Sequence, residues 1–157
     1  MSGFRRGVRL GIDVGMARVG VARCDPDGML AVPVETVQRA DDSVARIVAL
    51  ADEHSAFEIL VGLPLNMRGE DTASTTDARE FAAALAAASP LPVRLIDERL
   101  STVSAHAALR DSGRSQRSSR SIVDQVAAVV LLQHALDVEK STGRPAGSPV
   151  PPAQEPA

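Results

Sequence analysis

The sequence predicts an α/β fold in which one mixed sheet of five strands is flanked by helices. Three short runs rich in β-branched residues, Val8–Val14, Val19–Arg23 and Leu30–Val37, are separated only by turns, which is typical of an antiparallel meander. Two later runs, Glu58–Leu63 and Val93–Ile96, are mostly apolar, as expected of parallel strands buried on both faces. Helical patterns separate and follow these two runs. We therefore expect three antiparallel strands and then two parallel ones.

In the first half of the chain, turn signals and one apolar helical stripe predict the order of the strands and the helix. Gly15–Arg18 and Asp25–Gly28 carry the residues of tight turns and end the first and second strands. The segment Asp42–Glu53 then repeats apolar residues at the spacing of one helix face. The residues of this stripe are Val44, Ile47, Val48 and Ala51.

Three further helices are predicted in the second half. The first is the Ala-rich segment Thr72–Ala88, where Ser74 and Asp77 have the spacing of a capping box. A short helix is expected over Thr102–Arg110 and a long one over Ile122–Glu139. The order of elements is then βββαβαβαα.

The composition fits a single domain over residues 1–140. The chain has 157 residues, 45% hydrophobic and 24% charged, as in ordinary globular domains. Five of the ten prolines fall within residues 145–157, so we expect residues 141–157 to be a disordered Pro-rich tail. The stretch Ser112–Ser121 contains no apolar residue and is predicted to be a loop. One cysteine, no apolar run of ~20 residues and no signal-peptide pattern favour a cytoplasmic protein without a membrane partner.

The charge and aromatic content exclude some classes of nucleic-acid binder. Seventeen Lys and Arg against twenty Asp and Glu give a net charge of −3, and three phenylalanines are the only aromatic residues. A broad basic surface is therefore absent. Proteins that stack successive bases on aromatic side chains are also excluded. Any contact with a polyanion has to be local.

Three acidic residues lie in or next to predicted buried segments, where unpaired acidic residues are rare. Asp13 lies inside an apolar strand, Glu98 directly follows a buried strand, and Asp124 continues the apolar stripe of the last helix. Each position also has an explanation without a functional site. Asp13 could be a turn residue or pair with Arg18, and Glu98 could be a solvated residue at the end of a strand. Asp124 could interact with the helix dipole. Alternation sends Asp97 and Glu98 to opposite sides, so only one of them faces a given site.

Together the three acids predict a metal site. Carboxylates that converge repel one another unless a cation neutralises them. A set of oxygen ligands suits Mg²⁺ or Mn²⁺. Two such ions would serve hydrolysis of a phosphodiester bond.

Four motifs in order resemble a known family. They are Gly11–Gly15 with Arg18–Ala22, then Val61–Gly69, Asp97–Thr102 and Val123–Ala128. From about residue 8 to residue 136, the chain resembles the YqgF family of pre-16S rRNA nucleases, also described as similar to Holliday junction resolvases. The resemblance implies an RNase H-like fold and an acidic site at Asp13, Glu98 and Asp124. It also implies maturation of the 5′ end of 16S rRNA, with pre-rRNA, branched DNA and ribosomal precursor particles as candidate partners.

Several polar residues near the acids are candidates for phosphate contacts. Arg18 lies in the first motif, Asn66 and Arg68 follow a strand, and Arg99 adjoins Glu98. Asn66 could instead form a local turn, and Arg99 could pair with Asp97. The Ser-rich loop adds three charges in a chain of net charge −3, which leaves about −6 elsewhere. A positive arm beside Asp124 could bind the nucleic-acid backbone, although a solvated linker explains it equally well. Its residues are Arg114, Arg117 and Arg120.

Three other functions compete with the nuclease. A ribosome-assembly factor that binds without cutting is the main rival, and a resolvase of branched DNA is another. An actin-like ATPase or sugar kinase shares the Asp-x-Gly hairpin but needs a second domain, for which about 140 ordered residues leave no room. The acidic trio favours an enzyme, because a pure binder gains nothing from clustered negative charge. The sequence does not decide between monomer and dimer.

Overall fold

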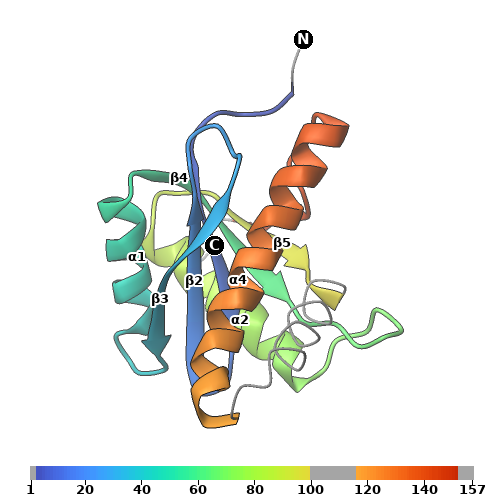
Figure 1. Ribbon diagram of the computed structural model, residues 1–157. Coiled ribbons are helices and arrows are strands. Elements are labelled where there is room, and N and C mark those ends of the chain that lie inside the picture. Colours follow the sequence, from blue (N-terminus) through green and yellow to red (C-terminus); the bar gives the residue numbers. More distant parts are fainter. Residues whose placement is uncertain (1–2, 100–115, 152–157) are drawn as a thin grey trace, which may run out of the picture.

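The computed structural model describes residues 3–99 and 116–151, with residues 116–124 described by their backbone alone. A six-stranded sheet runs through the molecule in the order β3-β2-β1-β4-β5-β6 (Figure 1). The expected α/β architecture, a mixed sheet flanked by helices, is confirmed.

The sheet has an antiparallel half and a parallel half. β1 (Val8–Val14), β2 (Arg18–Cys24) and β3 (Ala31–Gln38) form the predicted meander. β4 (Ala56–Leu63) lies parallel to β1, and β5 (Val93–Asp97) lies parallel to β4. The carboxyl ends of β1, β4 and β5 therefore meet at one end of the sheet.

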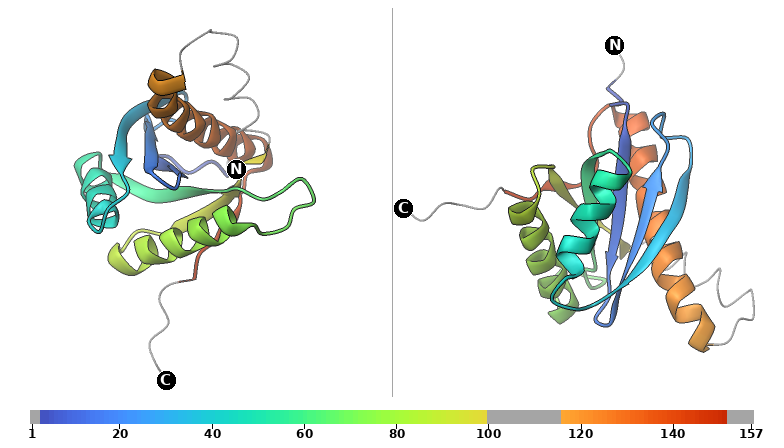
Figure 2. Two further views of the ribbon diagram at one scale, coloured as in Figure 1. Left: turned by 90° about the horizontal axis from the view of Figure 1, so that it is seen from below. Right: turned by 90° about the vertical axis from the view of Figure 1, so that its left-hand side faces the viewer.

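Helices cover both faces of the sheet (Figure 2). α1 (Ser43–Glu53) and α2 (Ala73–Ala88) lie on one face, and α4 (Gln116–Thr142) lies on the other. None of the helices within the described residues is long and apolar enough to span a bilayer. The two faces have separate apolar cores, so each strand of the centre is buried on both sides.

Alternation along β1 separates these two cores. Leu10 and Ile12 are fully buried in the core beneath α1 and α2. Gly11 faces α4, where a Cβ at this position would lie 2.9 Å from the Cβ of Leu132 and 3.1 Å from the carbonyl oxygen of Ala128. Glycine at this position therefore allows the helix to lie close to the sheet.

Buried ion pairs connect the amino end of the sheet to the end of α4. Arg9 and Glu139 are almost wholly buried, with 1% and 3% of their side chains exposed, and their atoms Nη2 and Oε2 lie 2.9 Å apart. Arg5 donates to both Glu58 and Glu139. The guanidinium groups of Arg5 and Arg9 also lie 5.1 and 4.8 Å from the ring centre of Phe57. These groups fix the amino end of the domain, opposite the carboxyl ends of the parallel strands.

The structure corrects the predicted number of strands. The sixth strand, β6 (Ser148–Pro149), comes from the segment expected to be a tail, and it pairs antiparallel with β5. Ala146 is buried before it, and the amide of Val150 donates to the carbonyl of Val93. Residues 143–151 therefore complete the sheet edge, and residues 152–157 of the predicted tail lie outside the described part.

Two helix starts also differ from the prediction. α4 begins at Gln116 instead of Ile122, so the second half of the predicted loop Ser112–Ser121 is helical. The cap of α2 is formed by Thr72 and Thr75, not by Ser74 and Asp77. The predicted helix Thr102–Arg110 lies outside the described residues.

Candidate active site at the carboxyl ends of the strands

Asp13 lies near the end of β1 on the face that α4 covers. It is partly buried, and its partner on β2 is Gly20. Gly20 in turn pairs with Thr36 of β3. Because paired residues of neighbouring strands point to the same face, Thr36, Gly20 and Asp13 form one row across the sheet.

Glu98 reaches the same face from β5. Its side chain is buried, and its amide donates to the carbonyl of Leu63 at 3.3 Å. The carboxyl group lies directly over Gly62 of β4: a Cβ on this glycine would overlap the Oε2 atom and lie 3.0 Å from Cδ. Since Ile12 pairs with Val61, the next residues, Asp13 and Gly62, are neighbours across β1 and β4. Asp13 and the Glu98 carboxyl group thus lie on the same face of the sheet, one beside Gly62 and the other over it.

Asp97 points away from this site. It is exposed and forms an ion pair with Arg99, with 2.6 Å between Nη2 and Oδ2. The hydrogen bonds from Arg99 hold the pKa of Asp97 below its ordinary value. The two consecutive acids therefore separate, as alternation requires.

The backbone of α4 brings residue 124 over the same row. Gln125, the next residue, donates from Nε2 to the hydroxyl of Thr36 at 2.8 Å. The following turn passes over Gly11 at Ala128. The side chain of Asp124 lies outside the described residues. Among the side chains that are described, no group of three His, Cys, Asp or Glu residues could hold a metal ion.

Asn66 forms a turn after β4. Its Oδ1 accepts from the amides of Arg68 and Glu70, both at 2.9 Å, and its carbonyl accepts from the amide of Gly69. Arg68 is exposed on this turn, and Arg99 lies against it, with Nη1 3.4 Å from a Cβ position on Gly69. The turn role of Asn66 and the ion pair of Arg99 are both present.

The remaining candidates for phosphate contacts are only partly described. Arg18 begins β2 and is partly buried, and its carbonyl accepts from the amide of Gly15 across the turn that follows Asp13. Arg117 and Arg120 lie in the first part of α4, where only the backbone is described. Arg114 lies outside the described residues.

Comparison with known proteins assigns the chain to a family. Residues 7–138 match the model of RuvX, a family described as Holliday junction resolvase. The chain belongs to the RuvX family. The resemblance carried by the four sequence motifs is thereby confirmed, and it makes the chain a nuclease, a hydrolase of phosphodiester bonds.

Curated members of the RuvX family match nearly the whole chain. A protein of Clavibacter michiganensis named as a pre-16S rRNA nuclease is 55% identical over 94% of both chains. A protein of Leifsonia xyli with the same name is 56% identical over 95% of this chain and 97% of its own. Relatives with this name thus match this chain over nearly the full length of both proteins.

Solved structures confirm the fold of this RuvX-family chain. RuvC from Thermus thermophilus in complex with a Holliday junction substrate superposes with a TM-score of 0.56 and 18% identity, covering 91% of this chain and 99% of that one. A second structure of the same protein gives a TM-score of 0.54. At this level of identity the likeness concerns the fold alone.

One residue that supports the site had no signal in the sequence. Arg39, just after β3, donates to both carboxylate oxygens of Asp77 on α2, at 2.8 and 3.0 Å, and to the carbonyl of Gly15 at 2.9 Å. Its guanidinium also lies 5.2 Å from the ring centre of Phe81. The hydrogen bonds from Arg39 lower the pKa of Asp77. Arg39 therefore ties the turn that follows Asp13 to α2. Its partners lie 24 and 38 positions away, beyond the reach of any local pattern.

Proposed function

We propose that this chain hydrolyses phosphodiester bonds of pre-16S rRNA in the maturation of its 5′ end, with Asp13, Glu98 and Asp124 as the catalytic acids. We assign the activity to residues 1–140. Relatives of the same length, named as pre-16S rRNA nucleases, support the substrate. The proposal implies action in the cytoplasm, where bacterial ribosomal precursor particles are assembled.

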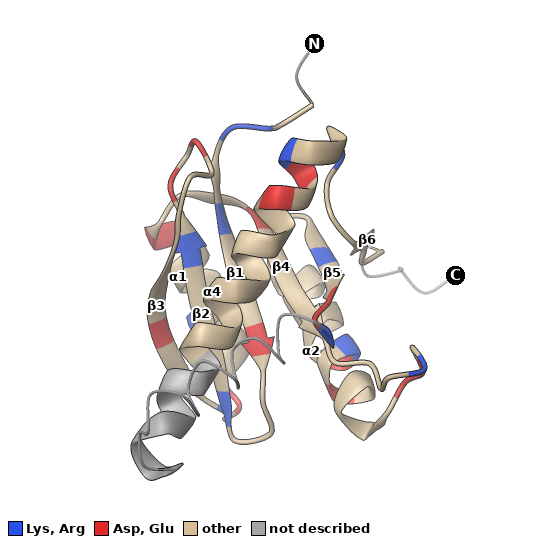
Figure 3. Cartoon of the chain, turned by 45° about the vertical axis from the view of Figure 1, so that its right-hand side comes forward, with Lys and Arg blue, Asp and Glu red and all other residues tan. Residues whose placement is uncertain are grey.

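One observation carries the choice of residues: the Glu98 carboxyl group lies over Gly62, the residue that neighbours Asp13 on the same face of the sheet. Glycine at position 62 leaves room for the Glu98 carboxyl group above the sheet. Both acids lie at the carboxyl ends of the parallel strands, the end at which α/β sheets commonly bind ligands, and Figure 3 shows acidic segments (red) near these strand ends.

The donor set fits a divalent cation. All three acids supply oxygen, which Mg²⁺ and Mn²⁺ prefer. Asp13, Glu98 and Asp124 would hold the metal, and we propose two ions, which when bound supply an activated water and neutralise the leaving oxygen. The carboxylates also depend on the fold: Glu98 requires glycine at position 62, and Asp13 lies next to the turn that Arg39 holds.

The basic residues orient the substrate backbone in this proposal. Arg68 lies on the turn after β4, the Arg99 guanidinium lies against the same turn, and Arg18 begins the strand paired to β1. Arg99 has a second role, since its ion pair keeps Asp97 occupied away from the metal. Arginine suits phosphate because its planar group donates two parallel hydrogen bonds. The arm Arg114, Arg117 and Arg120 adds charge without reading bases.

Cleavage assays test the proposal. The purified chain is incubated with a 16S rRNA precursor fragment carrying its 5′ extension, in Mg²⁺, Mn²⁺ or EDTA, beside the variant Asp13→Asn. We expect cleavage that EDTA abolishes and that the variant loses by at least about 10²-fold. Cleavage that survives both treatments refutes the role of the acids. Binding of the fragment without cleavage by the wild type would instead favour an assembly factor.

A four-way DNA junction is the second substrate to test. The family description names Holliday junction resolvase, and the superposed RuvC structure contains such a junction. Faster cleavage of the junction than of the rRNA fragment, under identical conditions, would assign the chain to branched DNA.

A further inference from the structure

Two exposed methionines lie on the loops around the candidate site. Large apolar side chains that are exposed number four within the described residues: Met16 at 74%, Met29 at 70%, Leu30 at 62% and Met67 at 86%. Met16 lies in the turn after β1, and Met67 lies in the loop after β4. Because β1 and β4 are parallel neighbours, both loops leave the sheet at the end that carries Asp13 and Glu98.

The turn that carries Met67 has a fixed shape. Four hydrogen bonds to and from Asn66 close it: its carbonyl accepts from Gly69, its Oδ1 accepts from Arg68 and Glu70, and its amide donates to the carbonyl of Glu70. Gly69 has the positive φ of 78° that this turn requires. The fixed backbone thus presents the Met67 side chain to solvent.

The turn that carries Met16 is fixed as well. The amide of Gly15 donates to the carbonyl of Arg18 at 2.8 Å, and Arg39 binds the carbonyl of Gly15. A Cβ at Gly15 would lie 2.7 Å from the carbonyl oxygen of Arg18, so only glycine allows this closure. Met16 therefore projects from a second rigid turn, two strands away from β5.

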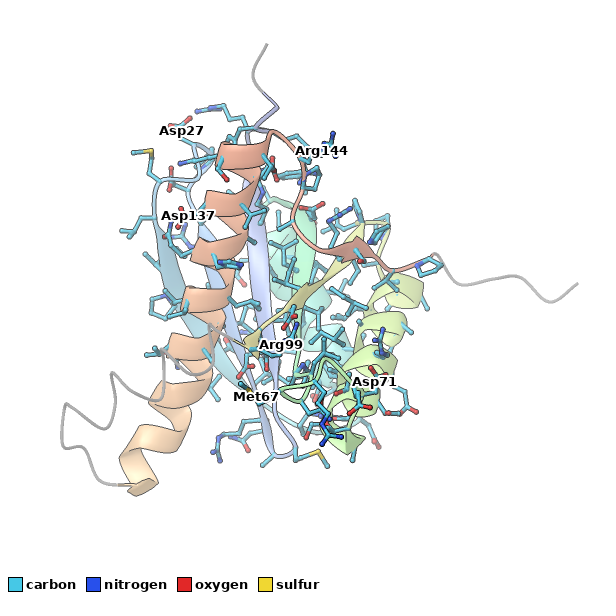
Figure 4. The ribbon with its side chains drawn as sticks, turned by 90° about the vertical axis from the view of Figure 1, so that its right-hand side faces the viewer. Asp27, Met67, Asp71, Arg99, Asp137 and Arg144 are labelled. Atoms are coloured by element: carbon cyan, nitrogen blue, oxygen red, sulfur yellow. The ribbon has the colours of Figure 1, made fainter. Side chains whose placement is uncertain are left out.

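Two arginines, which can bind phosphate, lie near Met67. Arg68 is adjacent and exposed, and the Arg99 guanidinium lies against the same turn. Figure 4 shows Met67 and Arg99 together at the lower end of the molecule, with Asp27 at the opposite end. A ligand that offers both phosphate and an apolar surface fits this combination, and a nucleotide offers both. Methionine is unbranched and polarizable, and its sulfur makes favourable contacts with aromatic rings.

We propose that Met67 and Met16 contact nucleobases of the substrate on either side of the bond to be cut, with Met67 making the larger contribution. This inference rests on the proposed function of the site. It adds a contact with bases to an enzyme that has no exposed aromatic platform for them. The contact is apolar and independent of base identity, so it selects unpaired nucleotides whose faces are free, not a particular sequence. Paired and stacked bases do not expose these faces.

Binding measurements separate this inference from the proposed catalysis. Fluorescence anisotropy gives the Kd of a precursor RNA fragment in the background Asp13→Asn, where RNA is not cut. A second RNA lacks the bases of the nucleotides next to the cleavage point. Met67→Ala is compared with Met67→Leu, which keeps the apolar volume. It is also compared with Met29→Ala, which removes another exposed methionine between β2 and β3, at the other end of the sheet.

We expect Met67→Ala to raise the Kd of the intact RNA by about 5- to 20-fold, which is the effect of losing part of one buried apolar side chain. Met16→Ala should raise it by about 2- to 5-fold on the same basis. Met67→Leu and Met29→Ala should stay within about 2-fold of the parent. Removal of the bases should weaken RNA binding by the parent more than Met67→Ala does. It should weaken binding by Met67→Ala only by the remaining share of Met16, about 2- to 5-fold.

Two results would overturn the inference. One is a Kd of Met67→Ala within 2-fold of the parent, and the other is an equal loss in both proteins when the bases are removed. If either result is found and the wild type still cleaves the RNA, the proposed contact between methionine and bases is refuted, while the proposed nuclease function is retained. Absence of binding to every RNA refutes both.

Discussion

Replacing Gly62 by alanine should remove activity while preserving the fold. The added Cβ would overlap Oε2 of Glu98 and lie 3.0 Å from its Cδ, whereas carbon atoms in contact normally lie about 3.5–4.0 Å apart. The carboxylate therefore has to move by about 1 Å. A displacement of this size in a catalytic group costs about 10²-fold in rate, which corresponds to about 2.7 kcal/mol in the barrier.

The cost to stability should be small for a structural reason. The other near neighbour of this Cβ is Cδ2 of Leu131, at 3.3 Å. Both neighbours are ends of side chains that can rotate away. We expect kcat to fall by about 10²-fold on the precursor RNA, while the midpoint of thermal unfolding changes by less than about 4 °C, the effect of roughly 1 kcal/mol.

Gly11→Ala is the matched control on the same sheet face. There the neighbours are the Cβ of Leu132 and the main chain of Ala128, which cannot rotate away without moving α4. We expect this variant to lose about 1–3 kcal/mol of stability. Replacement of glycine by alanine is thus expected to reduce activity at position 62 and stability at position 11.

A double-mutant cycle tests whether displacement of the Glu98 carboxylate causes the loss of activity in Gly62→Ala. Once Glu98→Ala has removed the carboxylate, Gly62→Ala has nothing to displace, so the double variant should be no slower than Glu98→Ala alone. A further loss of about 10²-fold in the double variant would refute the reasoning. A kcat of Gly62→Ala within about 3-fold of the wild type would refute it as well.

Three further predictions concern the fixed parts of the molecule and the basic arm. Glu139→Gln should cost about 3–5 kcal/mol of unfolding free energy in denaturant titrations, because it leaves the buried Arg9 without its full charge partner; a cost below 1 kcal/mol would contradict this. Burial raises the pKa of Glu139, but hydrogen bonds from Arg5 and the charges of Arg9 and Arg5 outweigh it, so the pKa is lowered from 4.5. The stability that this group contributes is therefore present above pH 4.5 and lost as the pH falls through the lowered value; Glu139→Gln should flatten that part of the pH profile, and an unchanged profile would assign the loss to other groups. Arg39→Ala should lower kcat by about 3- to 10-fold through the turn after Asp13, with KM changed less and with partial rescue by Arg39→Lys; equal changes in both constants would indicate a general loss of structure. Replacing Arg114, Arg117 and Arg120 by alanine should weaken RNA binding and reduce the slope of log Kd against log salt by about 2, as expected for three lost phosphate contacts on single-stranded RNA; an unchanged slope would remove the arm from binding.

Local patterns were sufficient to predict the central elements. β-branched runs and apolar stripes reflect burial against the two cores. They therefore predicted the bounds of β1 to β5, α1 and α2 to within about two residues. Alternation also predicted that Asp97 and Glu98 would separate, since it follows from the geometry of an extended chain. The structure adds why Glu98 can be buried where it is, namely the glycine beneath it.

Features that depend on distant partners were not predictable. β6 is two residues long, includes a proline and is defined only by its pairing with β5, so it has no periodicity of its own. The start of α4 was missed because residues 116–121 carry no apolar stripe. Once the buried part of the helix has formed, each further residue adds a backbone hydrogen bond at little cost. The Arg39–Asp77 pair joins residues 38 positions apart.

The network of Arg5, Glu58 and Glu139 has a practical consequence for handling the protein. It holds the incoming chain at the amino end of β1, and Val150 leaves the sheet beside Val93, at the amino end of β5. Both exits thus lie away from Asp13 and Glu98. An affinity tag, a fluorophore or a surface linker attached at either exit would therefore start at the end of the sheet opposite the proposed catalytic acids.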